Sequence, residues 1–344
     1  MNKMTGRRAF AGWSILLCIS VGWHSRVSAQ KLVEVSGQAQ GTYFIVKYVS
    51  NDTTSLRPQI DSLFGVIDHS LSLYKPGSLI NQFNEGNEVQ MDEHMAYVIK
   101  RSLEISKSTN GAFDITVKPL VDAWGFGVHK PAAQHVPGPD TLKRILRYVG
   151  SKYLQVHGQT LVKRKKDVQI DCNGIAQGYT TDVIARFLQQ KGITDYLVDV
   201  GGELAGSGKN HRGKIWTVGI ETPAAIESPY PAQALLELNN KAITTSGNYR
   251  RFFEQGGTRF THSINPSTGQ ALHSNIIAVT VMAKDAVTAD GYDNALILMG
   301  VEKGLDFIRK HPEYGLDAYF IYKNKKGEIT TAFSAGYSKI VLTR

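Results

Sequence analysis

The sequence predicts an α+β fold, and three observations carry this prediction. The chain has 344 residues, enough for one large domain or two modest ones with a substantial core. Segments with helical spacing and segments with strand spacing follow one another without the strict alternation of a parallel βαβ sheet. After the N-terminal segment, no stretch approaches the ~20 consecutive apolar residues of a membrane span.

The first half of the chain begins with a predicted strand at Gly41–Tyr48, which is rich in aromatic and β-branched residues. Apolar residues at helical spacing then predict helices over 56–72 and 94–109. Residues 129–140 hold three prolines and two histidines and predict a loop. The next predicted elements are a short helix at Leu142–Val149, paired strands at Tyr153–Val156 and Thr160–Lys163, and a strand at Val168–Asp171.

The second half is richer in strands. A helix is predicted at Gly178–Gln190, and Gly192 ends it because glycine readily adopts the conformation that closes a helix. Strands are expected at Tyr196–Val200, Trp216–Ile220, Ala234–Leu238, Ala242–Thr245, Thr258–His262 and Ile276–Ala283. A helix around Asp290, a helix near 302–310 and strands at 317–323 and 329–334 complete the chain. We find no internal repeat, and residues 30–344 are expected to form the functional domain.

Residues 1–29 have the three parts of an export signal. Lys3, Arg7 and Arg8 give a positive start, and Ala9–Trp23 is mostly apolar but too short to span a membrane. Val27-Ser28-Ala29 is typical of a cleavage site, so we expect cleavage after Ala29 and an exported protein.

Two details leave the route and the anchoring open. Gly6-Arg7-Arg8-Ala9-Phe10 resembles a twin-arginine signal, with Gly6 where Ser or Thr is usual, so general and twin-arginine export both remain. Leu16-Leu17-Cys18 hints at a lipoprotein site, with Leu17 where a small residue is usual. Lipidation of Cys18 would anchor the protein to a membrane.

The net charge of the chain narrows the classes of ligand that the protein can bind. Residues 1–29 hold four basic residues and no acids, so their removal lowers the formal net charge from +9 to +5. This mildly basic chain suits an anionic ligand but does not have the signature of a nucleic-acid-binding protein.

Cys172 is the only cysteine after the signal, which excludes an internal disulfide. Its place beside Asp171 leaves two interpretations, a thiol nucleophile or a small buried hydrophobe.

Asp290 and Asn294 stand one helical turn apart. Side chains at i and i+4 project from the same face of a helix, so their oxygens can converge. Mg²⁺ prefers oxygen ligands and often binds a phosphate through one or two carboxylates. The alternative is that Asp290 caps the start of the helix.

Three polar segments bring glycine close to possible ligands. Asp171-Cys172-Asn173-Gly174-Ile175-Ala176-Gln177-Gly178-Tyr179 lies between a predicted strand and a helix, where free amides suit a phosphate. It is neither a Walker A loop nor a G-x-G-x-x-G motif. Gly201-Gly202 forms a second close-approach turn, and Ser246-Gly247-Asn248-Tyr249 lies in a third polar segment. Each can also be a plain turn.

Histidine and aromatic residues add further candidates. His262 precedes the turn Asn265-Pro266-Ser267-Thr268-Gly269 and is a candidate base, because imidazole titrates near neutrality. It can equally be a structural residue at a strand end. Tyr74 and Trp124 lie beside glycine or proline and can stack on a flat ring or belong to the core. Gly111-Ala112-Phe113-Asp114 ends the second helix with a small, an aromatic and an acidic residue.

Taken in order, these motifs resemble the FAD:protein FMN transferases, the ApbE-like family. The likeness covers residues 35–340. The motifs that carry it are Gly41-Thr42, Leu71–Ser78 with Asn81 and Asn84, Gly111–Asp114 with Pro119-Leu120 and Trp124–Gly127, Asp171…Gly178-Tyr179, Val200–Gly202, Ser246–Tyr249, His262…Pro266…Gly269 and Thr288–Asp290.

The resemblance implies an α+β fold with T-fold-like parts, mixed or antiparallel sheets with packed helices, and FAD in a cleft between two lobes. It implies Mg²⁺ held by the Gly174 carbonyl, Asp290 and Asn294. It implies that FAD contacts Gln40, Tyr74, Ala112, Phe113, Asp114, Asp171, Gln177 and Ile264. The family transfers FMN from FAD to a threonine or serine hydroxyl of a target protein and releases AMP, with His262 at the position of the base.

The sequence departs from the family's pattern at several positions. Asn294 stands where threonine is frequent, Gln177 where lysine or glutamate is frequent, and Gln40 where methionine is usual. Asn265 and Ser267 replace a usual aspartate and a common arginine. Asp290 and His262 are retained, so the implied chemistry is unchanged.

Two other functions remain open at this point. Water in place of the protein hydroxyl would make the protein a Mg²⁺-dependent FAD pyrophosphatase, and the same residues serve both reactions. A flavin-binding protein without turnover is the other alternative, although a pure binder needs no metal beside the pyrophosphate. For the transferase we expect periplasmic acceptors, exported or membrane-bound redox subunits with a target threonine, and no nucleic acid.

Overall fold

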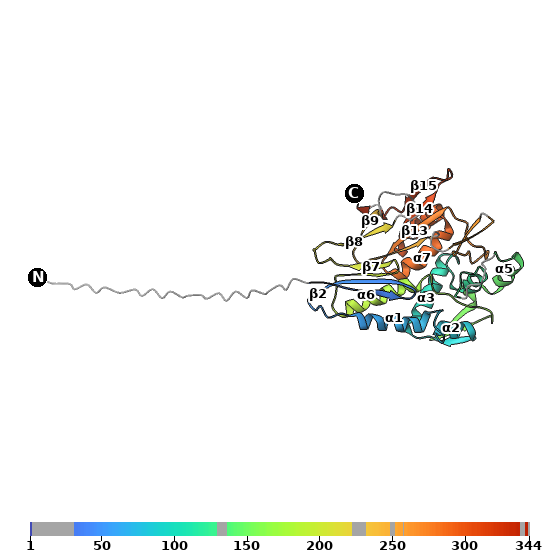
Figure 1. The fold of residues 1–344 in the computed structure, drawn as a ribbon, viewed down its shortest axis with the longest axis horizontal. Coiled ribbons are helices and arrows are strands. Elements are labelled where there is room, and N and C mark those ends of the chain that lie inside the picture. The colour runs from blue at the N-terminus through green and yellow to red at the C-terminus, as the bar shows by residue number, and fades with distance from the viewer. Residues whose placement is uncertain are drawn as a thin grey trace.

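The structure is a computed structural model that describes Met1 and residues 31–128, 136–221, 232–247, 252–256, 258–337 and 341–342. Most of the predicted export signal, with Cys18, lies outside these residues, as do Asn248 and Tyr249 and the first part, 129–135, of the predicted 129–140 loop. The α+β prediction is confirmed, since helices and antiparallel strands are mixed along the described chain (Figure 1). No helix of the described part is long and apolar enough to cross a bilayer.

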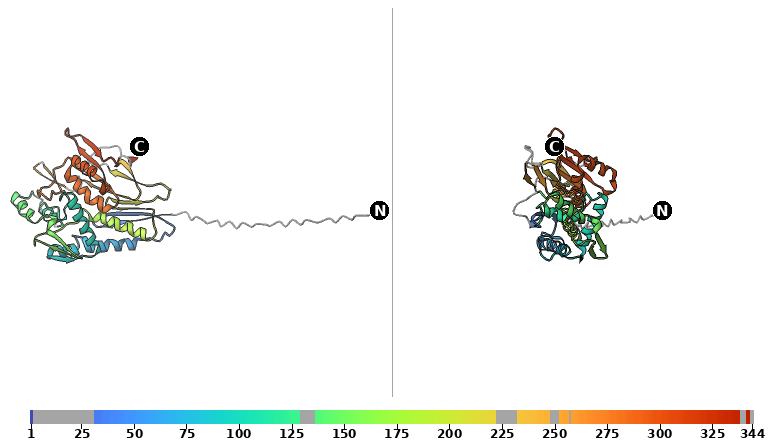
Figure 2. Two further views of the ribbon diagram at one scale, coloured as in Figure 1. Left: turned by 180° about the vertical axis from the view of Figure 1, so that it is seen from behind. Right: turned by 90° about the vertical axis from the view of Figure 1, so that its right-hand side faces the viewer.

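A central sheet of eight strands organises the molecule (Figures 1 and 2). Its order is β1 (Lys31–Ala39), β2 (Thr42–Ser50), β6 (Tyr196–Val200), β7 (Glu203–Ser207), β10 (Lys241–Gly247), β13 (Ile276–Ala283), β14 (Asp317–Lys323) and β15 (Ile329–Phe333). Every neighbouring pair is antiparallel. The sequence did not predict β1, whose side chains are mostly exposed, or β7, whose Gly206 and Ala205 weaken the strand pattern.

Three smaller sheets border the central one. They consist of β3 (Glu88–Gln90), β5 (Thr160–Lys163) and β4 (Leu154–His157); of β16 (Val341–Leu342), β9 (Ala232–Leu238) and β8 (Trp216–Glu221); and of β11 (Phe252–Gln255) with β12 (Thr258–Thr261). The predicted hairpin around His157-Gly158 is confirmed. Buried Trp216, Leu236 and Leu238 of the β8–β9 sheet pack against one face of the central sheet.

Helices cover the other face. The longer ones are α1 (Arg57–Leu71), α3 (Glu93–Ser108), α6 (Ala176–Gln190), α7 (Ala286–Met299) and α8 (Val301–Lys310), and the short ones are α2 (Leu79–Glu85), α4 (Lys118–Ala123) and α5 (Pro139–Ile145). α6 packs on β6 and β7, and α7 packs on β10 and β13. α5 begins at Pro139, inside the predicted loop, because proline fits the first turn of a helix.

The strand predicted at Val168–Asp171 is wrong. The segment forms no strand ladder, because the side chain of Asn84 takes the place of a partner strand. The Ile170 amide donates to Asn84 Oδ1 at 2.7 Å, and Asn84 Nδ2 donates to the Ile170 carbonyl at 2.9 Å. The Asp171 amide donates to the Ile115 carbonyl at 2.7 Å. These bonds fix the segment that leads to Gly174.

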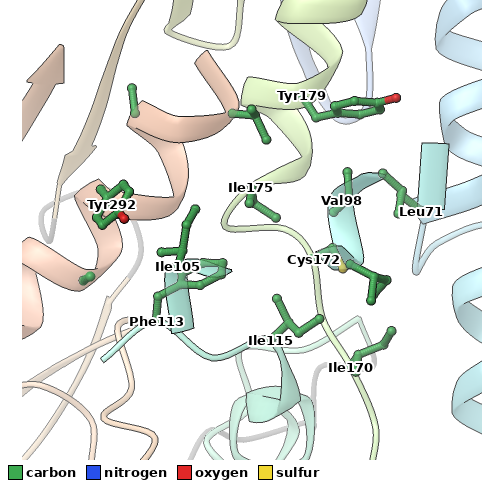
Figure 3. Packing of buried hydrophobic residues seen from close by; sticks show 14 of the residues in the cluster. Leu71, Val98, Ile105, Phe113, Ile115, Ile170, Cys172, Ile175, Tyr179 and Tyr292 are labelled. Atoms are coloured by element: carbon green, nitrogen blue, oxygen red, sulfur yellow. The ribbon is translucent and has the colours of Figure 1, made fainter. Parts of the chain in front are cut away.

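The largest hydrophobic cluster lies between the helices beside this segment. Ile105 of α3, Phe113, Ile175 and Tyr292 of α7 are buried together in it (Figure 3). Cys172 belongs to the same cluster, and burial raises the pKa of its thiol. The interpretation of Cys172 as a small buried hydrophobe is therefore confirmed, since a nucleophilic thiol needs a lowered pKa.

Candidate active site

One cavity of about 870 Å³ gathers the predicted site. Its volume lies within the range of about 300–1,000 Å³ typical of small-molecule sites. All twelve site residues predicted from the sequence line it: Gln40, Tyr74, Ala112, Phe113, Asp114, Asp171, Gly174, Gln177, His262, Ile264, Asp290 and Asn294. They come from segments up to about 250 residues apart in the chain, so the fold brings together what the sequence only suggested.

The centre of the cavity is built by the close packing of α6 on α7. A Cβ atom at Gly178 would lie 2.4 Å from the Ala286 carbonyl oxygen and 2.7 Å from Asp290 Cβ, so only glycine fits there. The Gly178 amide donates to Asp290 Oδ2 at 2.9 Å. In return, Asp182 of α6 accepts the amides of Ala286 and Val287, each at 2.8 Å. Each helix therefore satisfies free amides at the start of the other.

Asn294 links Gly174 to the backbone of Asp290. Asn294 Nδ2 donates to the Gly174 carbonyl at 3.3 Å and to the Asp290 carbonyl at 3.2 Å. A third bond runs from Asn294 Nδ2 to Asp293 Oδ1 at 2.9 Å. Asn294 thus presents its NH₂ group to the carbonyl that the resemblance assigns to the metal. Asp290 does not cap its helix, because the N-cap is Asp285.

Buried carboxyl groups cluster at this end of the cavity. Asp290 is 5% exposed and Asp293 only 1%. Burial raises the pKa of both, and for Asp293 the neighbouring Asp290 adds to the effect. Thr244 Oγ1 donates to Asp293 Oδ2 at 2.9 Å and partly offsets the cost of burial. Asp182 is also buried, which raises its pKa to about 7 against the opposing effect of its two amide donors.

The donor set suits a hard cation. Asp290 provides a carboxylate and Gly174 a carbonyl. Asn294 would provide its amide oxygen after a flip of its side-chain amide that exchanges the oxygen and the nitrogen. Mg²⁺ prefers such oxygen ligands. A cation would also offset the repulsion between the buried carboxylates. Within the described residues, no group of three or more His, Cys, Asp or Glu side chains has metal-binding geometry. A cation bound by Asp290, Asn294 and the Gly174 carbonyl would have one carboxylate and two neutral oxygens as ligands.

His262 stands on another wall of the cavity, just after β12. Its ring meets Phe126 edge-on, with centroids 6.5 Å apart. Ile264 is buried beside it and bridges Ala271, and the fully buried Trp124 donates from Nε1 to the Gly269 carbonyl at 2.8 Å. Trp124 is therefore a core aromatic that fixes the turn after His262.

Gln40 and Tyr74 also line the cavity. Gln40 adopts a positive φ of 52° at the tip of the β1–β2 hairpin. Its Nε2 donates to Asp68 Oδ1 at 3.1 Å, and its Oε1 accepts from Thr180 Oγ1 at 3.2 Å. Asp68 pairs with Lys75 at 2.8 Å, and the neighbouring Tyr74 is 61% exposed. The exposed ring of Tyr74 is thus available to a planar ligand.

Asp114 and Asp171 line the cavity but use their carboxylates within the protein. Asp114 accepts from the amides of Thr116 and Ser151, at 2.9 and 2.8 Å. Asp171 Oδ1 accepts from the Asn173 amide at 2.7 Å, while desolvation raises its pKa. These two side chains hold the loops that shape the floor.

Several cavity residues were missed by the sequence reasoning. Glu203 lines the cavity directly after the predicted Gly201-Gly202 turn, and Asp68 lines it from α1. Asp182 lies beneath the site and has no motif of its own. The Gly201-Gly202 pair could have pointed to Glu203, but nothing in the sequence distinguishes Asp68 or Asp182 from other helical aspartates.

Comparisons with known proteins identify the family. The model described as the ApbE family matches residues 40–320. The chain belongs to the ApbE family. A relative from Klebsiella pneumoniae named FAD:protein FMN transferase is 36% identical over 341 residues, which cover 95% of each chain. One of the same name from Vibrio cholerae is 35% identical over 282 residues, 79% of this chain and 83% of that protein.

Solved structures of ApbE proteins have the same fold. The flavin transferase ApbE from Vibrio cholerae superimposes with a TM-score of 0.81 at 31% identity, over 90% of this chain and 99% of that one. The apo form of the Pseudomonas stutzeri flavinyl transferase ApbE gives 0.82 at 30% identity, over 90% and 97%. The resemblance stated from the motifs and the predicted fold class are therefore confirmed.

Proposed function

We propose that this protein is an FAD:protein FMN transferase. It moves FMN from FAD to a threonine or serine hydroxyl of a target protein and releases AMP. The observation that carries the proposal is that all twelve predicted site residues line one cavity in a chain that matches proteins of that name over most of its length.

The reaction is a phosphoryl-group substitution. The target hydroxyl oxygen forms a bond to the phosphorus of the FMN half of FAD. The bond from that phosphorus to the bridging oxygen breaks, and AMP leaves with this oxygen and its electron pair. The product is a phosphoester-linked flavin, and the proton of the hydroxyl must pass to a base.

We assign Asp290, Asn294 and the Gly174 carbonyl as ligands of Mg²⁺. When bound there, the ion neutralises charge on the pyrophosphate. The residues themselves prepare the site: the Gly178 amide orients the Asp290 carboxylate, and the tight contact of α6 with α7 excludes water from behind it. Asn294 gives up its bond to the Gly174 carbonyl when it offers its oxygen.

We assign His262 as the base, since it lines the same cavity as the proposed metal ligands. In this arrangement the flavin ring lies against Tyr74, and the pyrophosphate lies toward Asp290 and the start of α6. The floor loops of Ala112–Asp114 and Asp171, together with Gln177 and Ile264, contact the rest of FAD.

We further propose export as the setting of the reaction. Residues 1–29 direct the protein to the periplasm, and a lipid on Cys18 or a retained signal would anchor it to the inner membrane. The acceptors are then exported or membrane-bound redox subunits. Intact mass of candidate exported redox proteins co-expressed with this enzyme tests the transfer, because each acceptor gains one FMN.

The pyrophosphatase and the passive binder are tested with FAD alone. AMP release on adding Mg²⁺ without any acceptor shows that water can replace the hydroxyl. A pyrophosphatase gives the same rate with and without a threonine-bearing target and leaves the target's mass unchanged. A passive flavin binder releases no AMP in either case.

A further inference from the structure

A group of exposed cations surrounds α5. We call it the basic face and define it as Lys143, Arg144, Arg147, Lys152, Arg164, Lys165 and Lys166, all of which are exposed. Residues 139–167, which carry them, hold eight basic and two acidic residues, a net charge of +6. Residues 30–344 as a whole carry +5, so the rest of that chain has a net charge of −1. The positive charge is thus concentrated in one short segment.

The cations of the basic face are not neutralised by the protein. Within the described residues, none of the seven forms an ion pair with a carboxylate. Basic residues on other helices do so with neighbours three or four positions away, as in Arg57 with Asp61, Arg101 with Glu104 and Lys118 with Asp122. Unpaired like charges held together repel one another, so the basic face has a cost in free energy that an anionic partner would remove.

Contacts within the segment keep these cations together. Lys165 Nζ donates to Tyr153 Oη at 3.0 Å and to the Arg147 carbonyl. Lys152 Nζ lies 5.2 Å from the centre of the Tyr153 ring, and Lys165 Nζ lies 4.1 Å from it. The Arg164 amide donates to the Tyr153 carbonyl at 2.9 Å. Tyr153 therefore joins the turn after β5 to the segment that follows α5.

The basic face is also fixed to the cavity. The Ser151 amide donates to Asp114 Oδ2 at 2.8 Å, and the Gly150 amide donates to Thr116 Oγ1 at 2.6 Å. Asp114 lines the cavity, so the middle of segment 139–167 is one hydrogen bond away from a cavity residue. In Figure 1, α5 lies at the end of the molecule opposite β8, and the reverse view in Figure 2 agrees.

We propose that the basic face docks an acidic surface of the acceptor protein and so presents the target hydroxyl to the cavity. The inference rests on the proposed function, since it concerns the second substrate of that reaction. A protein is favoured over free FAD because seven cations spread over several elements exceed what one pyrophosphate can contact. Complementary charge of this kind mainly speeds association and selects the partner.

The test compares two triple variants with equal loss of charge. Lys143→Gln/Arg147→Gln/Lys166→Gln removes three cations of the basic face whose side chains make no hydrogen bond to the described residues. Lys209→Gln/Arg212→Gln/Lys214→Gln removes three exposed cations between β7 and β8, at the opposite end. The probe is a fluorescein-labelled peptide with a central threonine among ten glutamates, and its glutamine counterpart is the uncharged control.

Fluorescence anisotropy at low salt should show that the wild type and the distal variant bind the glutamate peptide about 10-fold or more tightly than the basic-face variant. The difference should vanish at ~0.3 M salt, where exposed charges are screened. Equal affinity of all three proteins, or equal loss in both variants, overturns the proposal.

Two further measurements separate other anionic partners. The KM for FAD in AMP release should be the same in all three proteins, and a rise confined to the basic-face variant would assign the face to FAD. In sedimentation assays, the protein should bind phosphatidylglycerol vesicles no more than phosphatidylcholine vesicles. Strong binding to phosphatidylglycerol vesicles, together with no binding of the glutamate peptide, would assign the basic face to a membrane. If the wild type releases no AMP from FAD with Mg²⁺ and a threonine-bearing target, the proposed function is refuted. Peptide binding is measured without FAD and reports on the basic face separately.

Discussion

Asp182 and Asp290 lie on facing helices, and each accepts backbone amide hydrogens from the other's helix. Asp182 of α6 receives the Ala286 and Val287 amides of α7, and Asp290 of α7 receives the Gly178 amide of α6. The two helices are thus locked in one relative position. Because α7 also carries Asn294, this lock sets the geometry of the proposed metal site.

Gly178→Ala should separate the two helices. The added methyl group would overlap the Ala286 carbonyl, which belongs to the backbone and cannot rotate away. We expect a loss of about 1–3 kcal/mol in the free energy of unfolding, with weaker Mg²⁺ binding by calorimetry. Gly65→Ala on α1 is the matched control, since a Cβ there meets nothing within 4 Å, and it should stabilise the protein by about 0.5–1 kcal/mol. Equal stability of the two variants would contradict the close packing.

Asp182→Asn should flatten the dependence of stability on pH. Burial raises the pKa of Asp182 from 3.8 to about 7, so the folded state favours the protonated carboxyl. The resulting stabilisation is complete below about pH 4 and is lost as the pH rises through about 7. We therefore expect the free energy of unfolding, measured by denaturant titration at several pH values between these limits, to change less with pH in the variant than in the wild type.

Asp290→Asn should abolish Mg²⁺-dependent transfer while the protein still binds FAD. The amide keeps an acceptor for Gly178 but removes the single carboxylate of the proposed site. Loss of several kcal/mol of transition-state stabilisation corresponds to about 10³-fold in rate. Single-turnover transfer and FAD binding, each measured with and without Mg²⁺, check this result, and a variant with wild-type transfer would sink the metal assignment.

Asn294→Thr should be tolerated or should raise activity. Threonine keeps an oxygen near the i+4 position and removes the NH₂ group that occupies the Gly174 carbonyl. The apparent Kd for Mg²⁺, measured by calorimetry, should therefore stay equal or decrease. A folded threonine variant without activity would show that the bond from Asn294 to Asp293 matters more than the metal contact.

His262→Ala should slow the chemical step more than it weakens FAD binding. A general base typically contributes about 10²–10⁴-fold in rate, whereas one imidazole adds little ground-state affinity. The check is single-turnover FMN transfer at saturating FAD across pH. If the wild-type rate and pH profile persist, His262 is a structural residue at the end of β12.

The sequence predicted the residue types of the site better than the elements that hold them. Spacing alone suggested that Asp290 and Asn294 converge. In the structure the Asn294 side chain reaches the Gly174 carbonyl, and the Asp290 carboxylate accepts from the Gly178 amide in the next turn of chain. Segment 168–171 was predicted as a strand, and in it Val168 and Ile170 alternate with polar residues. The backbone of Ile170 instead bonds the side chain of Asn84, which no local pattern could reveal. β1 was missed because an exposed edge strand has little apolar alternation.

The supporting residues were beyond sequence reasoning for a physical reason. Asp182 and Asp293 look like ordinary helical aspartates, and their role depends on which helix packs against them. That packing joins positions 104 to 112 residues apart, as between Asp182 and Ala286 and between Gly178 and Asp290. Periodicity describes one element at a time and carries no information on such pairings.

The pairing of α6 with α7 also has a consequence for how the protein is made. The Gly174 carbonyl and Asn294 are 120 positions apart, so the site cannot assemble until nearly the whole chain is available to fold. Contacts of such long sequence separation form slowly. A chain threaded unfolded across a membrane would therefore stay inactive during passage and gain its flavin chemistry only after delivery, whereas a chain carried across already folded could load FAD beforehand.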